Sequence, residues 1–184
     1  MTAHSDVRTK RRDRLISVAT GVFVAHGFRG VTMEAIAEAA SISKATLYSY
    51  FSDKAAVFDA AAEAVAHNLV GIVEAELKSD LDPKDAVMAA LTAKHVHIYG
   101  LVRQSQFSGD LFQAKDALSA NHFDDADAVI LEMLRTRLAP VCDDSLECAE
   151  LLLATSQGIA NVATSKDQLI ERIARLSVLI GDGQ

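Results

Sequence analysis

The stretch that decides the fold is residues 31–54, VTMEAIAEAASISKATLYSYFSDK. Thr32 and Ser43 are good N-cap residues, and each precedes a short amphipathic segment. We therefore expect one short helix over Met33–Ala40, a tight turn, and a second short helix over Lys44–Phe51. Two helices this short are not stable alone, so they must pack against the helix before them.

This arrangement is typical of a helix-turn-helix unit, here at about residues 33–52, whose second helix enters the DNA major groove. On a helical wheel Leu47 and Phe51 of that helix face the core, and the opposite side carries small residues. We expect DNA contacts from nine residues: Thr32, Ser43, Lys44, Ala45, Thr46, Tyr48, Ser49, Tyr50 and Lys54.

The residue types suggest a role for each contact. Lys44 suits guanine O6 and N7, and Ala45 suits a thymine methyl group. The hydroxyl groups suit phosphate oxygens, and Lys54 with the amides at the start of the next helix suits a further phosphate. The alternative is an ordinary helical hairpin whose tyrosines are half-buried.

Three runs resemble the DNA-binding signature of the TetR family of bacterial regulators. They are F-x-x-x-G-F-x-G-V-T at Phe23–Thr32, T-x-x-x-I-A-x-x-A at Thr32–Ala40, and S-K-A-T-L-Y-x-Y-F-x-x-K at Ser43–Lys54. The resemblance covers about the first 60 residues. Two positions depart from it: Ser41 stands in the turn where glycine is usual, and Ala45 stands where glycine is frequent. A positive φ costs more at serine than at glycine.

The resemblance implies a cytoplasmic, nucleoid-associated homodimer that binds a palindromic operator in double-stranded DNA. It also implies a C-terminal domain that binds a small hydrophobic ligand, and most often a repressor that the ligand releases. By the family pattern the last two helices, about 144–163 and 166–180, form the dimer interface. Its candidate residues are Leu151, Ala154, Gly158, Ile159, Val162, Leu169, Ile173 and Leu176.

The rest of the chain also has a helical pattern, and we expect an all-α fold of about nine helices. Residues 8–54 are expected to form the three-helix DNA-binding head, whose first helix ends at Gly27. Residues 55–184 are expected to form a larger ligand-binding and dimerisation domain. The expected helices there are 54–78, one starting at Asp82-Pro83, 125–139, 144–163 and 166–180, with 103–124 ambiguous.

Composition excludes several classes of protein. Half of the 184 residues are hydrophobic, which excludes a disordered chain. We find no run approaching the roughly 20 apolar residues of a membrane span, and expect no membrane partner. Only 2 Pro and 9 Gly occur, too few turn residues for a many-stranded β fold.

The net charge of −7 averages two unlike parts. Residues 1–54 hold eight Lys/Arg and five acids, whereas residues 55–184 hold ten Lys/Arg and twenty acids. A basic head on an acidic body suits a protein that places one end on a polyanion.

The ligand-binding part is weakly specified. A mostly apolar pocket with a few polar groups has these candidates: Met88, His95, Ile98, Tyr99, Phe107, Phe112, His122 and Met133, with Phe123 and Leu134 as further lining. Each of these also suits an ordinary core.

No metal, cofactor or catalytic set is expected. His95 and His97 lie about 200° apart on a helix and cannot share an ion. Asp124, Asp125 and Asp127 suit a solvated helix start, and Cys142 and Cys148 suit inert thiols, with a redox sensor as the alternative.

Two other functions remain open. One is an enzyme or a lipid-binding or small-molecule-binding protein on a related all-α scaffold, for which we find no nucleophile–base pair or phosphate loop. The other is an architectural DNA binder, which requires a more basic head.

Overall fold

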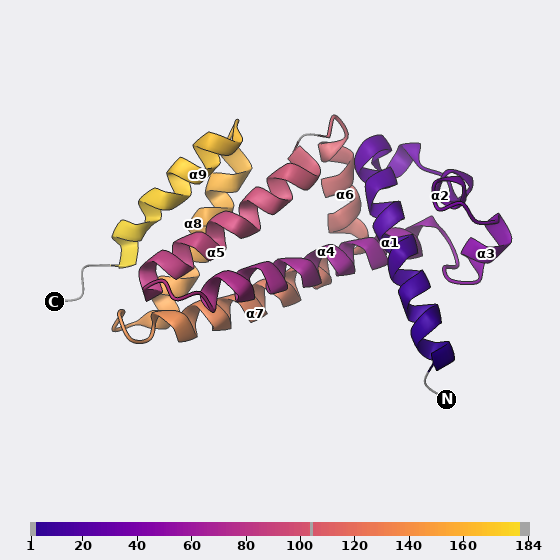
Figure 1. The fold of residues 1–184 in the computed structure, drawn as a ribbon. Coiled ribbons are helices and arrows are strands. Elements are labelled where there is room, and N and C mark those ends of the chain that lie inside the picture. Colours follow the sequence, from indigo (N-terminus) through magenta and orange to yellow (C-terminus); the bar gives the residue numbers. More distant parts are fainter. Residues whose placement is uncertain (1–2, 104, 181–184) are drawn as a thin grey trace. The chain divides into compact units, whose positions relative to one another are not determined.

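The computed structural model describes residues 3–103 and 105–180, and within these ranges the regular structure is entirely helical (Figure 1). The described helices are α1 (Ala3–Gly30), α2 (Met33–Ala39), α3 (Lys44–Tyr48), α4 (Lys54–Leu77), α5 (Pro83–Ile98), α6 (Ser108–Leu118), α7 (Ala120–Leu138), α8 (Ser145–Val162) and α9 (Lys166–Ala174). A π-helical turn, Tyr99–Arg103, follows α5, and a 3₁₀ segment, Arg175–Ile180, follows α9. The expected all-α fold with about nine helices is confirmed for this part of the chain.

The chain forms two compact units. The first unit contains the chain up to Val65 together with Val102–His122, and the second contains Ala66–Leu101 and the chain from Phe123 onward. Helix α4 therefore contributes to both. The sequence placed the domain limit after residue 54, whereas packing groups α6, from the middle of the chain, with the N-terminal helices.

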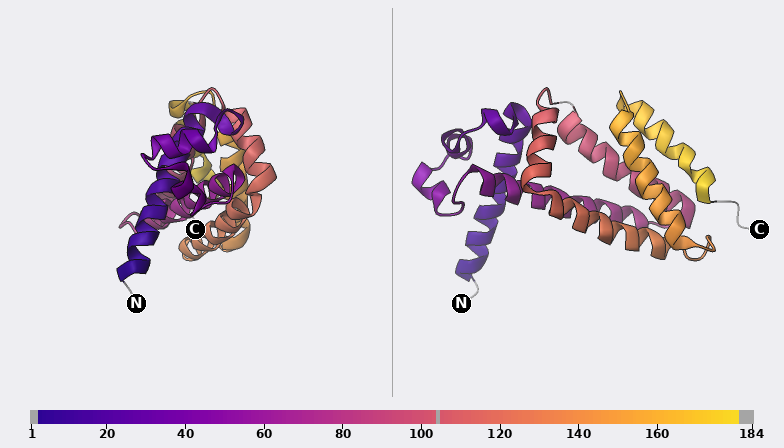
Figure 2. Two further views of the ribbon diagram at one scale, coloured as in Figure 1. Left: turned by 90° about the vertical axis from the view of Figure 1, so that its right-hand side faces the viewer. Right: turned by 180° about the vertical axis from the view of Figure 1, so that it is seen from behind.

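The first unit is built around α1. Its buried core includes Phe23, Ile36, Leu47 and Val57, one residue from each of the first four helices. Helix α1 was expected to end at Gly27. Instead it bends there, where φ is 71°, and continues to Gly30. A Cβ at Gly27 would lie 2.7 Å from an Asp110 carboxylate oxygen, so only glycine fits there. Figures 1 and 2 both show α6 beside α1 at this bend.

The second unit packs α5 against α8 and α9, as both figures show. Its core includes Val87, Leu134, Leu152 and Leu169, all fully buried. The helix starts agree with expectation: Asp82 caps α5 with Pro83 at the first position, and the Asp144 and Ser165 side chains accept from Glu147 N and Gln168 N. Residues 95–98 are helical, although their alternating pattern also suits a strand.

Three expected limits are wrong. Helix α3 ends at Tyr48 rather than Phe51. Helix α7 starts at Ala120, so Asp124 and Asp125 lie inside it and do not open it. The last regular helix ends at Ala174 rather than at residue 180. Segment ends such as these depend on packing more than on local sequence.

Helix α4 also corrects the membrane statement. Within the described residues it is the one helix long and apolar enough to cross a bilayer by length and composition alone. Its apolar residues contribute to the cores of the two units, for example Val57 and Phe58 in the first and Val73 and Leu77 in the second.

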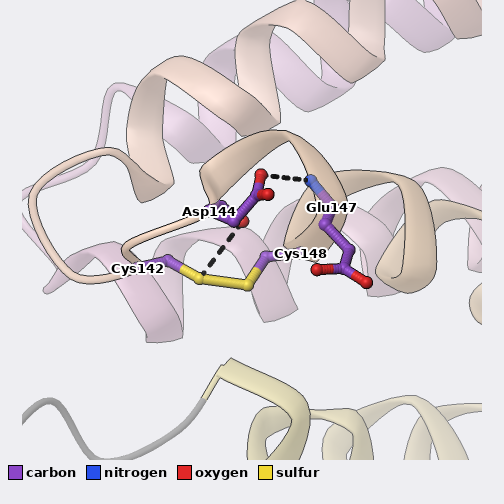
Figure 3. Close-up of a disulfide and its surroundings, with 4 residues drawn as sticks. All are labelled: Cys142, Asp144, Glu147 and Cys148. Atoms are coloured by element: carbon purple, nitrogen blue, oxygen red, sulfur yellow. Dashed lines mark hydrogen bonds between the residues drawn. A yellow bond between two sulfur atoms is a disulfide. The ribbon is translucent and has the colours of Figure 1, made fainter.

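The expectation of two inert thiols is corrected as well. Cys142 and Cys148 form a disulfide across the loop that leads into α8 (Figure 3). Asp144 lies between them and caps α8 by accepting from Glu147 N at 3.0 Å. The two cysteines lie on either side of this cap. The sequence spacing alone did not show that the chain turns back here and brings the sulfur atoms together.

Candidate nucleic-acid interface

Helices α2 and α3 form the predicted helix-turn-helix. Thr32 and Ser43 cap them, accepting from Ala35 N at 3.2 Å and Thr46 N at 3.1 Å. Between the helices Ser41 has φ 55°, the one positive φ at a described non-glycine residue. The turn therefore uses the left-handed conformation that glycine would adopt more cheaply.

The two faces of α3 agree with the helical wheel. Leu47 is fully buried and Phe51 nearly so, and both belong to the core of the first unit. On the outer side Ala45 is exposed and Tyr48 is 46% exposed. A large apolar ring left this accessible on a short helix is available to a partner.

Lys44 is the basic side chain of α3, and its ammonium group pairs with Glu34 of α2. The hydrogen bond from Lys44 lowers the pKa of the Glu34 carboxyl group, and the same contact raises the pKa of Lys44. The ammonium also lies 5.8 Å from the centroid of the Tyr48 ring. Both partners are exposed, so the pair is weak and can open for a stronger anion. The sequence reading missed Glu34, an acid ten positions before its partner.

The small hydroxyl groups of α3 are used locally. Ser43 Oγ lies 2.8 Å from Thr46 Oγ1, and Ser49 Oγ donates to the Thr46 carbonyl at 2.7 Å. These bonds fix both ends of a five-residue helix, so the three hydroxyl groups stabilise α3 in the free protein.

Lys54 differs most from its expected role. Its ammonium group donates to the carbonyls of Phe28 and Val31 at 2.8 and 2.9 Å, and lies 4.5 Å from the centroid of the Phe28 ring. The lysine thus ties the start of α4 to the end of α1. Asp53 caps α4 beside it, and the hydrogen bond from Ala56 N lowers the pKa of the Asp53 carboxyl group. We leave Lys54 out of the proposed DNA contacts.

Tyr50 is half-buried against the core, and the guanidinium of Arg8 lies 5.6 Å from the centroid of its ring. Arg12 lies in the same way over Phe51, at 5.4 Å. From the sequence, both arginines were counted only toward the positive charge of residues 1–54. The signal that marks them lies within the basic run Arg8–Arg14. Arg8 and Arg12 are four positions apart in that run, in register with the face of the helix that packs inward.

The pocket candidates fall into two sets. Phe107, Phe112 and His122 lie in the first unit, whereas Met88, His95, Ile98, Tyr99 and Met133 lie in the second. Phe123 and Leu134 also belong to the second unit. The structure therefore does not gather the set within one unit.

Several pocket candidates are ordinary core or surface residues. Met88 and Leu134 belong to the core of the second unit, and Phe112 is 41% exposed. Phe107 packs against the bend of α1. A Cβ atom added to Gly27 would lie only 3.0 Å from the Cβ atom of Phe107. Tyr99 donates its hydroxyl to the Thr164 carbonyl at 3.3 Å.

His95 is the pocket candidate with the most unusual environment. It is 1% exposed and its Nε2 lies 3.0 Å from Ser156 Oγ, which itself donates to the Leu153 carbonyl. Burial, with a smaller effect from the Lys94 charge, lowers the pKa of His95 to about 3. Next to it Lys94 is 2% exposed and pairs with Asp127 at 2.7 Å. His97 instead lies 3.2 Å from the Asn68 amide, so the two histidines have separate partners.

The dimer candidates divide between core and surface. Leu169, Ile173 and Leu176 are buried in the core of their own chain. Leu151, Ala154, Gly158 and Val162 are exposed along α8, and Ile159 is half-buried. Ile170 on α9 and Val178 beyond it, which the sequence reading did not include, are 37% and 79% exposed.

The described residues hold no cluster of three or more His, Cys, Asp or Glu side chains able to bind a metal ion. Ser119 and His122 resemble part of a catalytic set, but each contacts Asp59, at 3.0 and 2.9 Å. Both side chains therefore anchor to α4, with no serine–histidine hydrogen bond among these contacts to activate a nucleophile.

Comparison with known proteins places the helix-turn-helix in a family. Residues 15–61 match the family model described as bacterial regulatory proteins, tetR family. The HTH-type transcriptional activator FasR of Mycolicibacterium smegmatis is 35% identical over 86 residues. That match spans 47% of this chain and 39% of FasR.

Solved structures share the fold over most of the chain. A TetR/AcrR-family transcriptional regulator of Thermobifida fusca superposes with a TM-score of 0.71 at 20% identity, covering 94% of this chain and 97% of its own. Reduced NemR of E. coli gives 0.71 at 18% identity over 91% and 95%. The fatty acid degradation regulator FadR of Bacillus halodurans gives 0.66 at 16% over 93% and 95%. The similarity to the tetR family of bacterial regulatory proteins thus lies in residues 15–61, the part of the chain that holds the helix-turn-helix.

Proposed function

We propose that this protein is a transcriptional repressor that binds a palindromic operator as a homodimer and is released by a small hydrophobic ligand. The observation that carries the proposal is the outer face of α3. There Lys44 has only an exposed, exchangeable partner, while Ala45 and Tyr48 are accessible and Leu47 anchors the helix below them.

We assign each proposed contact by the chemistry of its side chain. Lys44 exchanges Glu34 for a guanine edge, and Ala45 contacts a thymine methyl group. Tyr48, Tyr50 and the hydroxyls of Thr32, Ser43, Thr46 and Ser49 contact phosphates and fix the register. A guanine edge competes well for Lys44, because the pair with Glu34 is exposed to water.

The exposed stripe of α8, formed by Leu151, Ala154, Gly158 and Val162, supports a dimer. Its small residues allow a second helix to approach closely, and Ile170 of α9 extends the apolar surface. A two-fold dimer binds half-sites whose spacing is about one helical turn or a multiple of it.

Ligand control requires a ligand that binds the DNA-incompetent state more tightly than the competent one. Helix α4 contributes residues to the cores of both units, which makes its Lys54–Val65 segment the proposed pivot.

FasR is named an activator, so a reporter gene fused to the selected operator is needed to distinguish repression from activation. Higher expression without the protein supports repression, and lower expression supports activation.

The test is selection of bound duplexes from random DNA at near-physiological salt. Wild type is run beside Lys44→Ala, Glu34→Gln and the control Lys78→Ala, which removes an exposed charge in the second unit. We expect an inverted repeat, with affinity reduced about 10- to 100-fold in Lys44→Ala. Glu34→Gln should bind more tightly than wild type, because it frees Lys44 and removes a negative charge. A folded wild-type dimer that enriches no sequence would contradict the proposal.

A further inference from the structure

The basic stretch at the start of α1 is the strongest charged feature that the proposed contacts do not use. Arg8–Arg14 contains five Lys/Arg and one acid. Arg8, Arg11 and Arg14 follow at intervals of three, which places them along one side of the helix, and all three are exposed. Like charges this close on one helix repel one another, so the arrangement favours a partner with dense negative charge.

The position of this segment is fixed by its contacts. Arg8 and Arg12 lie over the rings of Tyr50 and Phe51, at 5.6 and 5.4 Å. Such distances are typical of cation–π contacts. Tyr50 and Phe51 follow directly after α3 and its C-cap residue Ser49. The start of α1 is therefore held against the C-terminal end of the recognition helix, within the same unit.

The two pairs of arginines have different surroundings. The guanidinium groups of Arg8 and Arg12 are engaged with the aromatic rings, whereas the side chains of Arg11 and Arg14 extend from exposed positions. An arginine guanidinium presents its donors in a fork that matches phosphate geometry.

We propose that Arg11 and Arg14 form a second DNA contact, to backbone phosphates flanking the bases that α3 reads, and that Arg8 and Arg12 position them. This inference rests on the proposed function. The proposed phosphate contacts add electrostatic attraction to the DNA backbone but do not distinguish one base sequence from another. The acidic second part of the chain, with twenty Asp/Glu against ten Lys/Arg, disfavours a polyanion elsewhere.

The experiment measures operator affinity against salt concentration. A contact to a phosphate contributes about 0.9 to the slope of log K against log salt. The double variant Arg11→Ala/Arg14→Ala should therefore lower the slope by about 2 per bound protomer. Affinity for operator and for unrelated DNA should fall by the same factor.

Two controls separate the proposal from general charge and folding effects. Lys78→Ala/Arg175→Ala removes two exposed charges in the second unit, 71% and 73% exposed, and should leave the slope unchanged. Arg11→Lys/Arg14→Lys keeps the charge and should retain the slope. Arg8→Gln removes the contact to the Tyr50 ring. It should lower the salt slope by more than the single control variant Lys78→Ala does.

Each other outcome overturns the inference. A slope that falls equally in both alanine pairs shows an effect of net charge only. A slope unchanged in Arg11→Ala/Arg14→Ala, with normal operator selection by wild type, overturns the second contact and leaves the proposed function standing. A folded wild type that binds no DNA overturns both.

Discussion

The two units differ in where some of their most distinctive polar side chains lie. In the first unit Lys44 and Tyr48 are exposed on a helix whose apolar side is anchored in the core. In the second, Lys94, His95 and Ser156 are almost fully buried and each has a partner. The difference shows why the first unit was easier to predict from sequence: its helix-turn-helix is a short motif with an exposed face, and local residues determine it.

The buried polar groups of the second unit matter chiefly through the cost of leaving one of them without its partner. In the Lys94–Asp127 pair the lysine is buried whereas the carboxylate is 42% exposed, and removing Asp127 would be costly because it leaves the buried ammonium without its partner. The same holds for the His95–Ser156 contact, because an unpaired buried polar group costs roughly 1–3 kcal/mol. This core should therefore be sensitive to changes that leave one partner alone.

The largest expected effect tests whether the two cores are separate. Leu47→Ala in the first core and Leu152→Ala in the second each remove a fully buried side chain, which costs about 3 kcal/mol of unfolding free energy. Hydrogen exchange should show loss of protection in α1–α3 for the first variant and in α5 and α8 for the second.

Leu118→Ala, at a residue 39% exposed, is the control and should change the unfolding free energy by less than about 0.5 kcal/mol. Equal loss of protection throughout the chain in both core variants would show a single cooperative unit and break the comparison.

The next effect is a pH dependence that belongs to the second unit. Burial favours neutral His95 and lowers its pKa to about 3, whereas an unfolded histidine has a pKa near 6.5. Below pH ~6.5 the unfolded state binds a proton that the folded state does not. The stability present above that pH is therefore lost as the pH falls toward about 3, by about 1.4 kcal/mol per unit.

Denaturant unfolding between pH ~7 and pH ~5 measures this slope. His95→Gln should reduce the slope, and the exposed His67→Gln in α4 should not. The same slope in wild type and His95→Gln would mean that His95 is accessible to protons in the folded state.

The smallest effect concerns the turn of the first unit. Ser41 has φ 55°, a conformation that costs a non-glycine residue about 1 kcal/mol. Ser41→Gly relieves this cost but adds chain entropy to the unfolded state, so we expect a net stabilisation of about 0.5 kcal/mol. Ser49→Gly, at φ −72°, relieves no such cost, adds the same entropy and also removes the hydrogen bond from Ser49 Oγ to the Thr46 carbonyl, so it should destabilise. Thermal unfolding of the two variants compares the signs, and stabilisation by both would contradict this account.

Local sequence predicted much of the first unit. Thr32 and Ser43 were recognised as caps, and each accepts the expected backbone hydrogen bond. Leu47 and Phe51 were placed in the core by periodicity. These predictions succeed because a cap or a helix face depends on residues three or four positions away.

Lys54 shows where such reasoning fails. Its charge suited a phosphate, yet its ammonium group binds the carbonyls of Phe28 and Val31. Those carbonyls become available only because α1 bends at Gly27 and the chain then turns into α2. Glu34 was missed for a similar reason, since α2 and α3 must pack before it can reach Lys44.

The all-α fold, the helix-turn-helix and the resemblance to the TetR family were predictable from sequence, because periodicity, caps and a contiguous motif are local properties. Which apolar side chains are exposed and which lie in the chain's own core became visible only in the folded chain. Leu151 and Leu169 read alike as apolar positions near the C-terminus, but one is 51% exposed and the other fully buried. That distinction depends on which helices pack together, and packing joins residues far apart in the chain.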